Sequence, residues 1–99
     1  MKGYVVVNIE VKDPVRYQEY IKAAPVSIKE YGGRYLVRGG RTEKLEGTFE
    51  PRRFVVLEFA TYERAREWWD SQAYAHAKAL RQSCSRADLF LAEGCESPV

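Results

Sequence analysis

The sequence predicts an α+β fold, in which a four-stranded antiparallel sheet carries two helices on one face. Four short segments alternate apolar and polar side chains with the two-residue period of a β-strand. Two longer segments have apolar residues at helical spacing, and each lies between two of the strands. The chain has 99 residues, of which 45% are hydrophobic, which is enough for one core and too few for two. We therefore expect one domain over residues 1–95, followed by a polar C-terminal tail over residues 96–99.

The first strand is predicted over residues 4–11, because one of its faces is wholly apolar. That face carries Val5, Val7, Ile9 and Val11. A helix is expected from Asp13-Pro14, which supplies an N-cap acceptor and a proline suited to the first helical position. Its apolar stripe consists of Tyr17, Ile21, Ala24, Ile28 and Tyr31. Pro25 interrupts the stripe, so we expect a kink or two short helices that meet at Ala24 and Pro25.

A second strand is predicted over residues 34–38, between a glycine pair at positions 32 and 33 and another at 39 and 40. Regular alternation would place Arg34, Leu36 and Arg38 on one face and Tyr35 and Val37 on the other. The glycine pairs indicate points where the chain leaves a helix or ends a strand, and they lack the context of a phosphate-binding loop. Residues 41–51 show little periodicity and predict a long, partly extended connection.

The second half of the chain repeats the order of strand, helix and strand. A third strand is predicted over residues 53–60, with a face that carries Val55, Leu57 and Phe59. Residues 62–70 are expected to be helical, and Ser71 can cap a further helical segment. The residues expected to be buried in that segment are Ala73, Ala77, Leu80 and Cys84. Residues 88–93 are expected to form the fourth strand.

The order β-α-β-β-α-β is that of the ferredoxin-like fold, with strand order 4-1-3-2 and right-handed crossovers. The face beneath the helices would carry Val5, Val7, Ile9, Val55, Leu57 and Phe59. The open face would carry Tyr4, Val6, Asn8, Leu36, Arg38, Phe54, Val56, Glu58, Asp88 and Phe90. This second face is too apolar for water and too polar for an ordinary core, which favours a second copy of the chain as its cover. We therefore expect a homodimer, with Arg38 and Glu58 paired on adjacent strands.

The bulk composition excludes several classes of function. The 16 Lys and Arg residues against 14 Asp and Glu give a net charge of +2 without a basic block, so no nucleic-acid partner is expected. The N-terminus lacks the regions of a signal peptide and no apolar run approaches membrane length, which predicts a cytoplasmic protein without a membrane partner. Cys84, Cys95 and His76 do not have the spacing of a disulfide scaffold or a zinc site. We expect neither a metal nor a cofactor.

Three residues are candidate catalytic groups. His76 is a candidate acid or base because of its imidazole, but no carboxylate lies at helical spacing from it, which favours an ordinary histidine at the edge of a helix face. Glu58 and Asp88 share a predicted sheet face and can form an acid–base pair if burial raises their pKa values. Structural ion pairs with Arg38 or with the twofold mate explain these carboxylates equally well.

The candidate substrate-binding residues are an asparagine, an arginine and four aromatic side chains. They are Asn8, Tyr17, Arg38, Trp68, Trp69 and Tyr74. Arg38 can clamp a substrate carboxylate through two donors, with a structural ion pair as the alternative. The rings can line a pocket for a flat organic molecule, although rings at helical spacing more often belong to the core. Trp68 and Trp69 cannot both face inward, so one of them must lie at a rim or an interface.

Several motifs taken together resemble a known family. They are Gly32-Gly33-Arg34-Tyr35-Leu36-Val37-Arg38-Gly39-Gly40, Glu46-Gly47, Arg52-Arg53-Phe54-Val55-Val56-Leu57-Glu58-Phe59, Asp70-Ser71 with Tyr74 and Arg81, and Ala87-Asp88 with Glu93-Gly94. On these motifs the chain resembles domain-of-unknown-function family 1330. The resemblance covers nearly the whole chain. It implies a dimeric α/β barrel, in which two ferredoxin-like sheets close against each other, and it implies no established reaction.

Relatives in that superfamily include cofactor-free monooxygenases, lactone isomerases, haem-degrading enzymes and ligand-sensing domains. Asn8, Trp68 and His76 are similar to the residues on which the haem-degrading enzymes rely. The position where their histidine falls, ten residues after Trp68, is however Lys78 here. A displacement of two residues turns a side chain by about 200° around a helix, so His76 points elsewhere unless a break near Asp70 resets the phase. Haem degradation therefore remains a minor alternative.

The sequence thus predicts a small homodimer that binds a small organic molecule, aromatic or carboxylate-bearing, between its sheet and its helices. Cofactor-free oxygenation and isomerisation are the candidate reactions, because the fold alone does not select a chemistry. The alternative is a non-catalytic domain that senses a ligand or serves only for dimerisation. In that case the polar residues of the open face would only set the register of the dimer.

Overall fold

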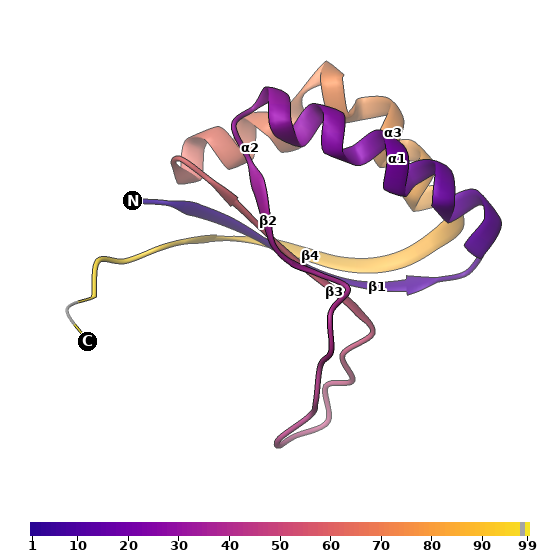
Figure 1. The fold of residues 1–99 in the computed structure, drawn as a ribbon, viewed down its shortest axis with the longest axis horizontal. Coiled ribbons are helices and arrows are strands. Elements are labelled where there is room, and N and C mark those ends of the chain that lie inside the picture. Colours follow the sequence, from indigo (N-terminus) through magenta and orange to yellow (C-terminus); the bar gives the residue numbers. More distant parts are fainter. Residues whose placement is uncertain (98) are drawn as a thin grey trace.

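The structure, a computed structural model, describes residues 1–97 and 99 and has the predicted ferredoxin-like arrangement of one antiparallel sheet beneath a layer of helices (Figure 1). Its elements are β1 (Gly3–Val11), α1 (Pro14–Glu30), β2 (Arg34–Arg38), β3 (Arg53–Phe59), α2 (Tyr62–Asp70), α3 (Gln72–Cys84) and β4 (Ser85–Glu93). The strand order β2-β3-β1-β4 confirms the prediction. Of the predicted tail, residue 98 lies outside the described residues.

The central strand β1 fixes the core, because it pairs with β3 on one side and β4 on the other. Val5, Val7 and Ile9 are nearly fully buried beneath the helices, as the two-residue period predicts. They are joined there by the buried residues of β3 that alternation also selects, Val55, Leu57 and Phe59. The fourth strand begins at Ser85, earlier than the sequence pattern indicates. It starts directly after α3, without an intervening loop.

Helix α1 begins as predicted and continues through Pro25 as one helix, so the alternative of two short helices is wrong. The Asp13 carboxylate accepts a hydrogen bond from the backbone N–H of Arg16 at 3.1 Å, which caps the helix. Proline has no N–H, so the carbonyl of Ile21 four residues earlier loses its partner within the helix. Arg38 supplies the missing donor, because its Nη2 lies 3.3 Å from that carbonyl oxygen. The helix therefore continues with its backbone acceptor satisfied from outside.

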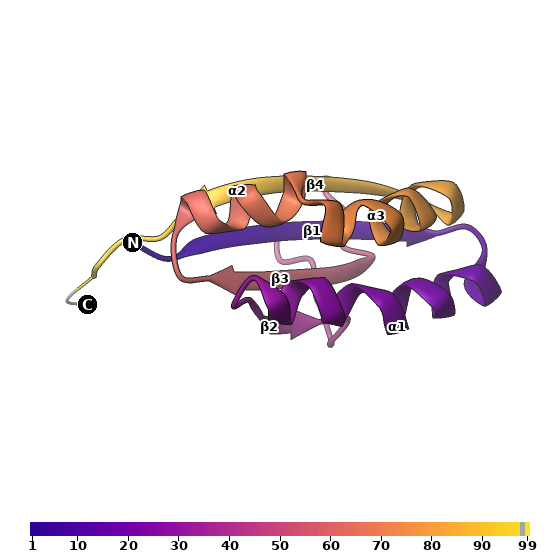
Figure 2. The same cartoon turned by 90° about the horizontal axis from the view of Figure 1, so that it is seen from above.

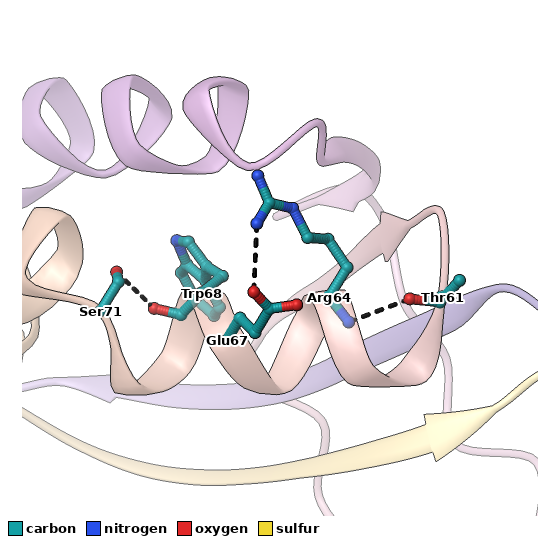
Figure 3. A network of polar contacts seen from close by, with 5 residues as sticks. All are labelled: Thr61, Arg64, Glu67, Trp68 and Ser71. Atoms are coloured by element: carbon teal, nitrogen blue, oxygen red, sulfur yellow. Dashed lines mark hydrogen bonds and ion pairs between the residues drawn. The ribbon is translucent and has the colours of Figure 1, made fainter.

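The second helical region is divided at Ser71, as predicted (Figure 3). Thr61 caps α2 by accepting from the N–H of Arg64 at 3.0 Å, and Ser71 caps α3 by accepting from the N–H of Tyr74. The Ser71 hydroxyl also donates to the Trp68 carbonyl at 2.7 Å, which ties the end of α2 to the start of α3. None of the three helices in the described part of the chain has the length and apolar character needed to span a bilayer.

Strand β2 departs from regular alternation, and this overturns the predicted pairing of Arg38 with Glu58. Arg34 lies opposite Glu58, but the register shifts between Tyr35 and Val37, so that Arg38 lies opposite Val55. Such a bulge places one extra residue in the strand and moves every later side chain to the other face. Arg38 consequently lies on the helix side, and Arg34 is the residue that pairs with Glu58 on the open face.

The predicted long connection between β2 and β3 forms an arm, residues 39–52, that projects on the side of the sheet away from the helices (Figure 1). Asn8 on β1 holds the base of the arm through its side-chain amide, which accepts from the N–H of Arg52 at 2.7 Å and donates to the carbonyl of Glu50. Leu45 and Phe49 on the arm are exposed to 90% and 56%. The arm therefore presents apolar side chains on the same side as the open face.

Candidate functional site

The helical layer covers the two halves of the sheet unequally. Seen from above in Figure 2, α1 lies over β2 and β3, whereas α2 and α3 lie over β1 and β4. The residues of β4 that face the helices remain half-buried, although their partners on β1 are almost fully buried. The uncovered volume forms an open cavity of about 430 Å³, here named the α3 cavity. It is lined by Val5, Arg66, Trp69, Arg81, Gln82, Ser85, Ala87, Leu89, Phe90 and Leu91.

Arg81 is the distinctive residue of the α3 cavity, because it is a cation with only 3% of its surface exposed. Among the described residues its side chain makes one hydrogen bond, from Nε to the Tyr74 hydroxyl at 3.4 Å, and no ion pair with a carboxylate. Every fully enclosed side-chain nitrogen or oxygen in the described part of the chain has a hydrogen-bond partner. The space that Arg81 lines is the α3 cavity.

The rest of the lining combines one aromatic wall with a few polar groups. Trp69 is half-buried, and Lys78 lies against its ring. The Nζ of Lys78 lies 4.3 Å from the ring centroid and donates to the Trp69 carbonyl. Arg66 lines the cavity at the rim and is held by Asp70 through a 2.8 Å contact between Nε and a carboxylate oxygen. No carboxylate and no histidine belongs to the lining among the described residues. The α3 cavity is thus cationic, with an apolar floor from β4 and a flat aromatic wall.

A second and much smaller cavity, of about 30 Å³, lies between α1 and the sheet and is here named the α1 cavity. Four of the predicted substrate-binding residues meet at its walls: Tyr17, Arg38, Trp68 and Tyr74. Arg53 donates from Nε to the Tyr17 hydroxyl at 3.2 Å, and Arg38 stacks on the Tyr35 ring with its central carbon 4.2 Å from the centroid. The volume is enough for about two water molecules and too small for an organic ligand. In this conformation these residues therefore serve packing.

Two tyrosine hydroxyls lie between the cavities. The hydroxyls of Tyr20 and Tyr74 are 2.9 Å apart, and that of Tyr74 also accepts from Arg81. Burial raises the pKa of Tyr20 far above its ordinary value of 10.0, and the neighbouring Tyr74 adds to the effect. Burial likewise raises the pKa values of Tyr17 and Tyr35, against the opposing charges of Arg53 and Arg38. Tyr17, Tyr20 and Tyr35 are therefore neutral at physiological pH.

The predicted catalytic carboxylates do not meet. Glu58 accepts from Arg34 Nε at 2.8 Å and from the Tyr4 hydroxyl at 3.2 Å, and the hydrogen bond from Arg34 holds the pKa of Glu58 below its ordinary value. Glu58 lies opposite Tyr4, whereas Asp88 lies opposite Asn8. Four residues of strand separate these two positions, which corresponds to about 13 Å. Both carboxylates lie on the open face, away from either cavity.

The three residues that resemble a haem site are also dispersed. Trp68 is a core residue with 1% exposure, whose Nε1 donates to the Ser27 hydroxyl at 3.1 Å. Asn8 holds the base of the arm on the open face, and His76 is exposed on α3. Of the two adjacent tryptophans, Trp69 is the one at a rim, as expected for one of the pair. The three residues that resemble a haem site, Asn8, Trp68 and His76, therefore do not lie together.

The sequence interpretation did not select Arg66, Arg81 or Gln82 for the site. Arg81 follows Ala77 by four positions and precedes Cys84 by three, so it lies on the apolar stripe of α3, and both of these neighbours are buried. An arginine on such a stripe is unusual, because a buried charge requires a partner or a ligand. The position of Arg81 on this apolar stripe was therefore the feature of the sequence that could have identified it. Ala73, which was assigned to the stripe, is exposed, and Tyr74 is buried in its place.

Solved structures with this fold support the architecture. RPA0582, a protein of unknown function from Rhodopseudomonas palustris, is 14% identical and superposes with a TM-score of 0.76, covering 97% of this chain and 84% of that chain. A dimeric ferredoxin-like protein of unknown function from Jannaschia sp. CCS1 is 14% identical, with a TM-score of 0.69 and coverage of 95% and 100%. SnoaB, a cofactor-independent oxygenase from Streptomyces nogalater, is 9% identical, with a TM-score of 0.61 and coverage of 98% and 96%. At these identities the likeness shows the fold alone.

No curated protein matches the chain. A family model does match, over residues 2–95, which is nearly the whole length and includes both glycine pairs, the Arg52-Arg53 strand and the α3 cavity. The chain therefore belongs to the family described as domain of unknown function DUF1330.

Proposed function

We propose that this protein binds a small organic acid in the α3 cavity, with the ligand carboxylate on Arg81 and its apolar part against Trp69. The observation that carries the proposal is the buried guanidinium of Arg81, a residue of the cavity lining that has no carboxylate partner among the described residues. Removing a charge from water is unfavourable unless a counter-charge compensates for it. A ligand carboxylate would provide that compensation through two parallel N–H···O hydrogen bonds.

The shape and chemistry of the cavity support a flat, largely apolar ligand. A volume of about 430 Å³ lies within the range of typical small-molecule sites. Trp69 offers a rigid ring with few rotamers to immobilise, and Leu89 and Leu91 offer an apolar floor. Arg66, Gln82 and Ser85 supply polar groups at the side of the cavity. An aryl carboxylate satisfies each of these features.

The test is a titration of benzoate and substituted benzoates into the protein, followed by the indole N–H resonances in NMR spectra and by calorimetry. Wild type should bind with a shift of the Trp69 resonance, and Arg81→Met should lose at least tenfold in affinity because a charged hydrogen-bonded contact is removed. Arg53→Met is the matched control, because Arg53 makes a similar bond to Tyr17 but lines the α1 cavity, and it should retain binding. Absence of binding by any aryl acid at millimolar concentration would refute the proposal.

We also propose that the protein is a homodimer whose open sheet faces are covered by each other. The open face carries Phe90 at 60% exposure, the arm adds Leu45 and Phe49, and a self-complementary patch of this kind suits a twofold axis. The Jannaschia neighbour, which is described as dimeric, supports the same assembly. Light scattering at micromolar concentration should report a dimer, and Phe90→Asp should shift it toward the monomer. A monomeric wild type would remove this part of the proposal.

Binding without proton transfer is favoured over acid–base catalysis, because among the described residues the lining of the α3 cavity contains no carboxylate or histidine. Cofactor-free oxygenation is the second candidate, supported by the likeness to SnoaB and by the Tyr74 hydroxyl, which lies against Arg81. Oxygen uptake in the presence of quinols separates the two. Uptake that is abolished by Tyr74→Phe, in a variant that still binds benzoate, would favour the oxygenase.

A further inference from the structure

We propose that the ion pair between Arg66 and Asp70 makes the α3 cavity selective for acids that carry a single negative charge. The inference rests on the proposed function, since it concerns the ligands of the same cavity. It assigns a specificity role to Asp70, a residue that lies outside the lining. The consequence is that a dicarboxylate should bind more weakly than a monocarboxylate of the same size and shape.

The charges around the cavity allow a simple count. Arg66 and Arg81 are the two cationic side chains of the lining. Asp70 already neutralises Arg66, with Nε and a carboxylate oxygen 2.8 Å apart, whereas Arg81 has no such partner among the described residues. Lys78 lies behind the lining and uses its ammonium group on the Trp69 ring and carbonyl. The lining therefore contains one positive charge without a carboxylate partner among the described residues, and one ligand carboxylate would balance it.

A second carboxylate on the ligand would meet Asp70 at the rim. It could approach Arg66 only by displacing Asp70 or by lying beside it, and two carboxylates close together repel each other. The pair is solvent-exposed, with 62% of the Arg66 side chain and 55% of the Asp70 side chain accessible, so its influence is moderate and depends on salt. We expect selectivity of about threefold at low ionic strength, which decreases as salt is added.

The probes are terephthalate and its monomethyl ester, because the two differ by one charge and hardly in shape. Affinities of wild type, Asp70→Asn and Glu67→Gln are measured by calorimetry at pH 7.5, in 20 mM and 500 mM sodium chloride. Glu67→Gln is the matched control, because Glu67 lies on the same helix and pairs with Arg64 at 3.3 Å, away from the cavity lining (Figure 3). Both substitutions remove one exposed negative charge, so they change the net charge of the protein equally.

Wild type and Glu67→Gln should prefer the monoester by about threefold after correction for the two equivalent carboxylates of terephthalate. Asp70→Asn should bring the two affinities together, chiefly by strengthening terephthalate binding. Equal affinities in wild type, or the same change in both variants, would overturn the charge selection while the proposed function stands. Failure of both probes to bind any of the three proteins would instead refute the proposed function, and the inference with it.

Discussion

The two halves of the helical layer each contain a hydrogen bond from an arginine to a tyrosine, but they differ in how tightly they pack around it. Beneath α1, Arg53 donates to Tyr17 beside a cavity of about 30 Å³. Within α3, Arg81 donates to Tyr74, and Arg81 lines a cavity of about 430 Å³. The same contact is therefore structural where the layer closes on the sheet, whereas under the proposed function it would be available to a ligand where the layer leaves space. How closely the helices cover the sheet, more than the type of residue, distinguishes the core contacts from those of the proposed site.

The largest change in the free energy of unfolding should come from replacing each of the two tryptophans in turn by alanine. Trp68→Ala removes a fully buried ring that stacks on Tyr74 with centroids 4.1 Å apart, so the free energy of unfolding should fall by about 3–5 kcal/mol. Trp69→Ala removes a half-buried ring at the cavity wall and should lower it by about 1 kcal/mol, while abolishing the binding of aryl acids. Urea denaturation measures both values. Equal losses from the two substitutions would contradict the division into a closed and an open half.

The next effect concerns the stability of the two arginine variants. Arg53→Met should lower the free energy of unfolding by about 1–2 kcal/mol, because the hydroxyl of buried Tyr17 loses its bond. Arg81→Met should leave stability within about 1 kcal/mol of wild type or raise it, because a buried and uncompensated charge is removed and Tyr74 still bonds to Tyr20. Thermal and urea denaturation at low salt provide the comparison. A large loss in Arg81→Met would show that this arginine is structural too.

A smaller loss of stability is expected when Arg38, which donates to the carbonyl left free by Pro25, is replaced. Arg38→Ala should lower the free energy of unfolding by about 0.5–1 kcal/mol, since the Ile21 carbonyl loses its donor. In a Pro25→Ala background the new N–H can bond to that carbonyl, so the same substitution should matter less. A double-mutant cycle should therefore give a coupling of about 0.5 kcal/mol. Strict additivity would mean that the contact with Ile21 contributes nothing.

The smallest effect is a change in pH dependence on the closed side. Burial raises the folded-state pKa of Tyr35 above its ordinary value of 10.0, so the resulting stability is fully present below pH 10 and is lost as the pH rises further. Tyr35→Phe removes this titration and should flatten the decline in stability between pH 10 and 11.5. At pH 7 the profile of the variant should have the same slope as wild type. An unchanged alkaline slope would show that Tyr35 ionises freely in the fold.

The fold could be predicted from sequence because its causes are local. The alternation of Val5, Val7 and Ile9 and the cap at Asp13 specify strand and helix by themselves, and the tertiary structure agrees with both. Pro25 was misjudged because its effect depends on a donor from β2, a segment beyond the reach of a local pattern. Helix ends and strand faces follow from neighbours in sequence, whereas rescue of an unpaired carbonyl follows from neighbours in space.

The site was predictable only in part, for a related reason. The aromatic and arginine candidates around Tyr17 and Tyr74 do cluster, yet they enclose little volume. Volume depends on how helices lie across strands, and no residue pattern states that α2 and α3 leave β4 partly uncovered. Arg81 was visible as a charge on an apolar stripe, but its proposed role follows from the absence of a carboxylate partner among the described residues, which the sequence does not show.

The bulge at Leu36 has a consequence for how the chain tolerates change. Counting along β2, Arg34 and Arg38 lie four positions apart and would share a face in a regular strand, yet one pairs with Glu58 and the other reaches Ile21. The extra residue reverses the parity of the strand, so β2 connects both layers of the molecule at once. If β2 alternated regularly over its five residues, Arg38 would lie on the open face, away from α1, and the Ile21 carbonyl before Pro25 would lose its donor. Deleting Leu36 would remove the bulge, yet it would leave Arg38 opposite Val55 on the helix side. A one-residue deletion at this point is therefore expected to preserve the support of α1, because Arg34 and Arg38 keep their opposite faces.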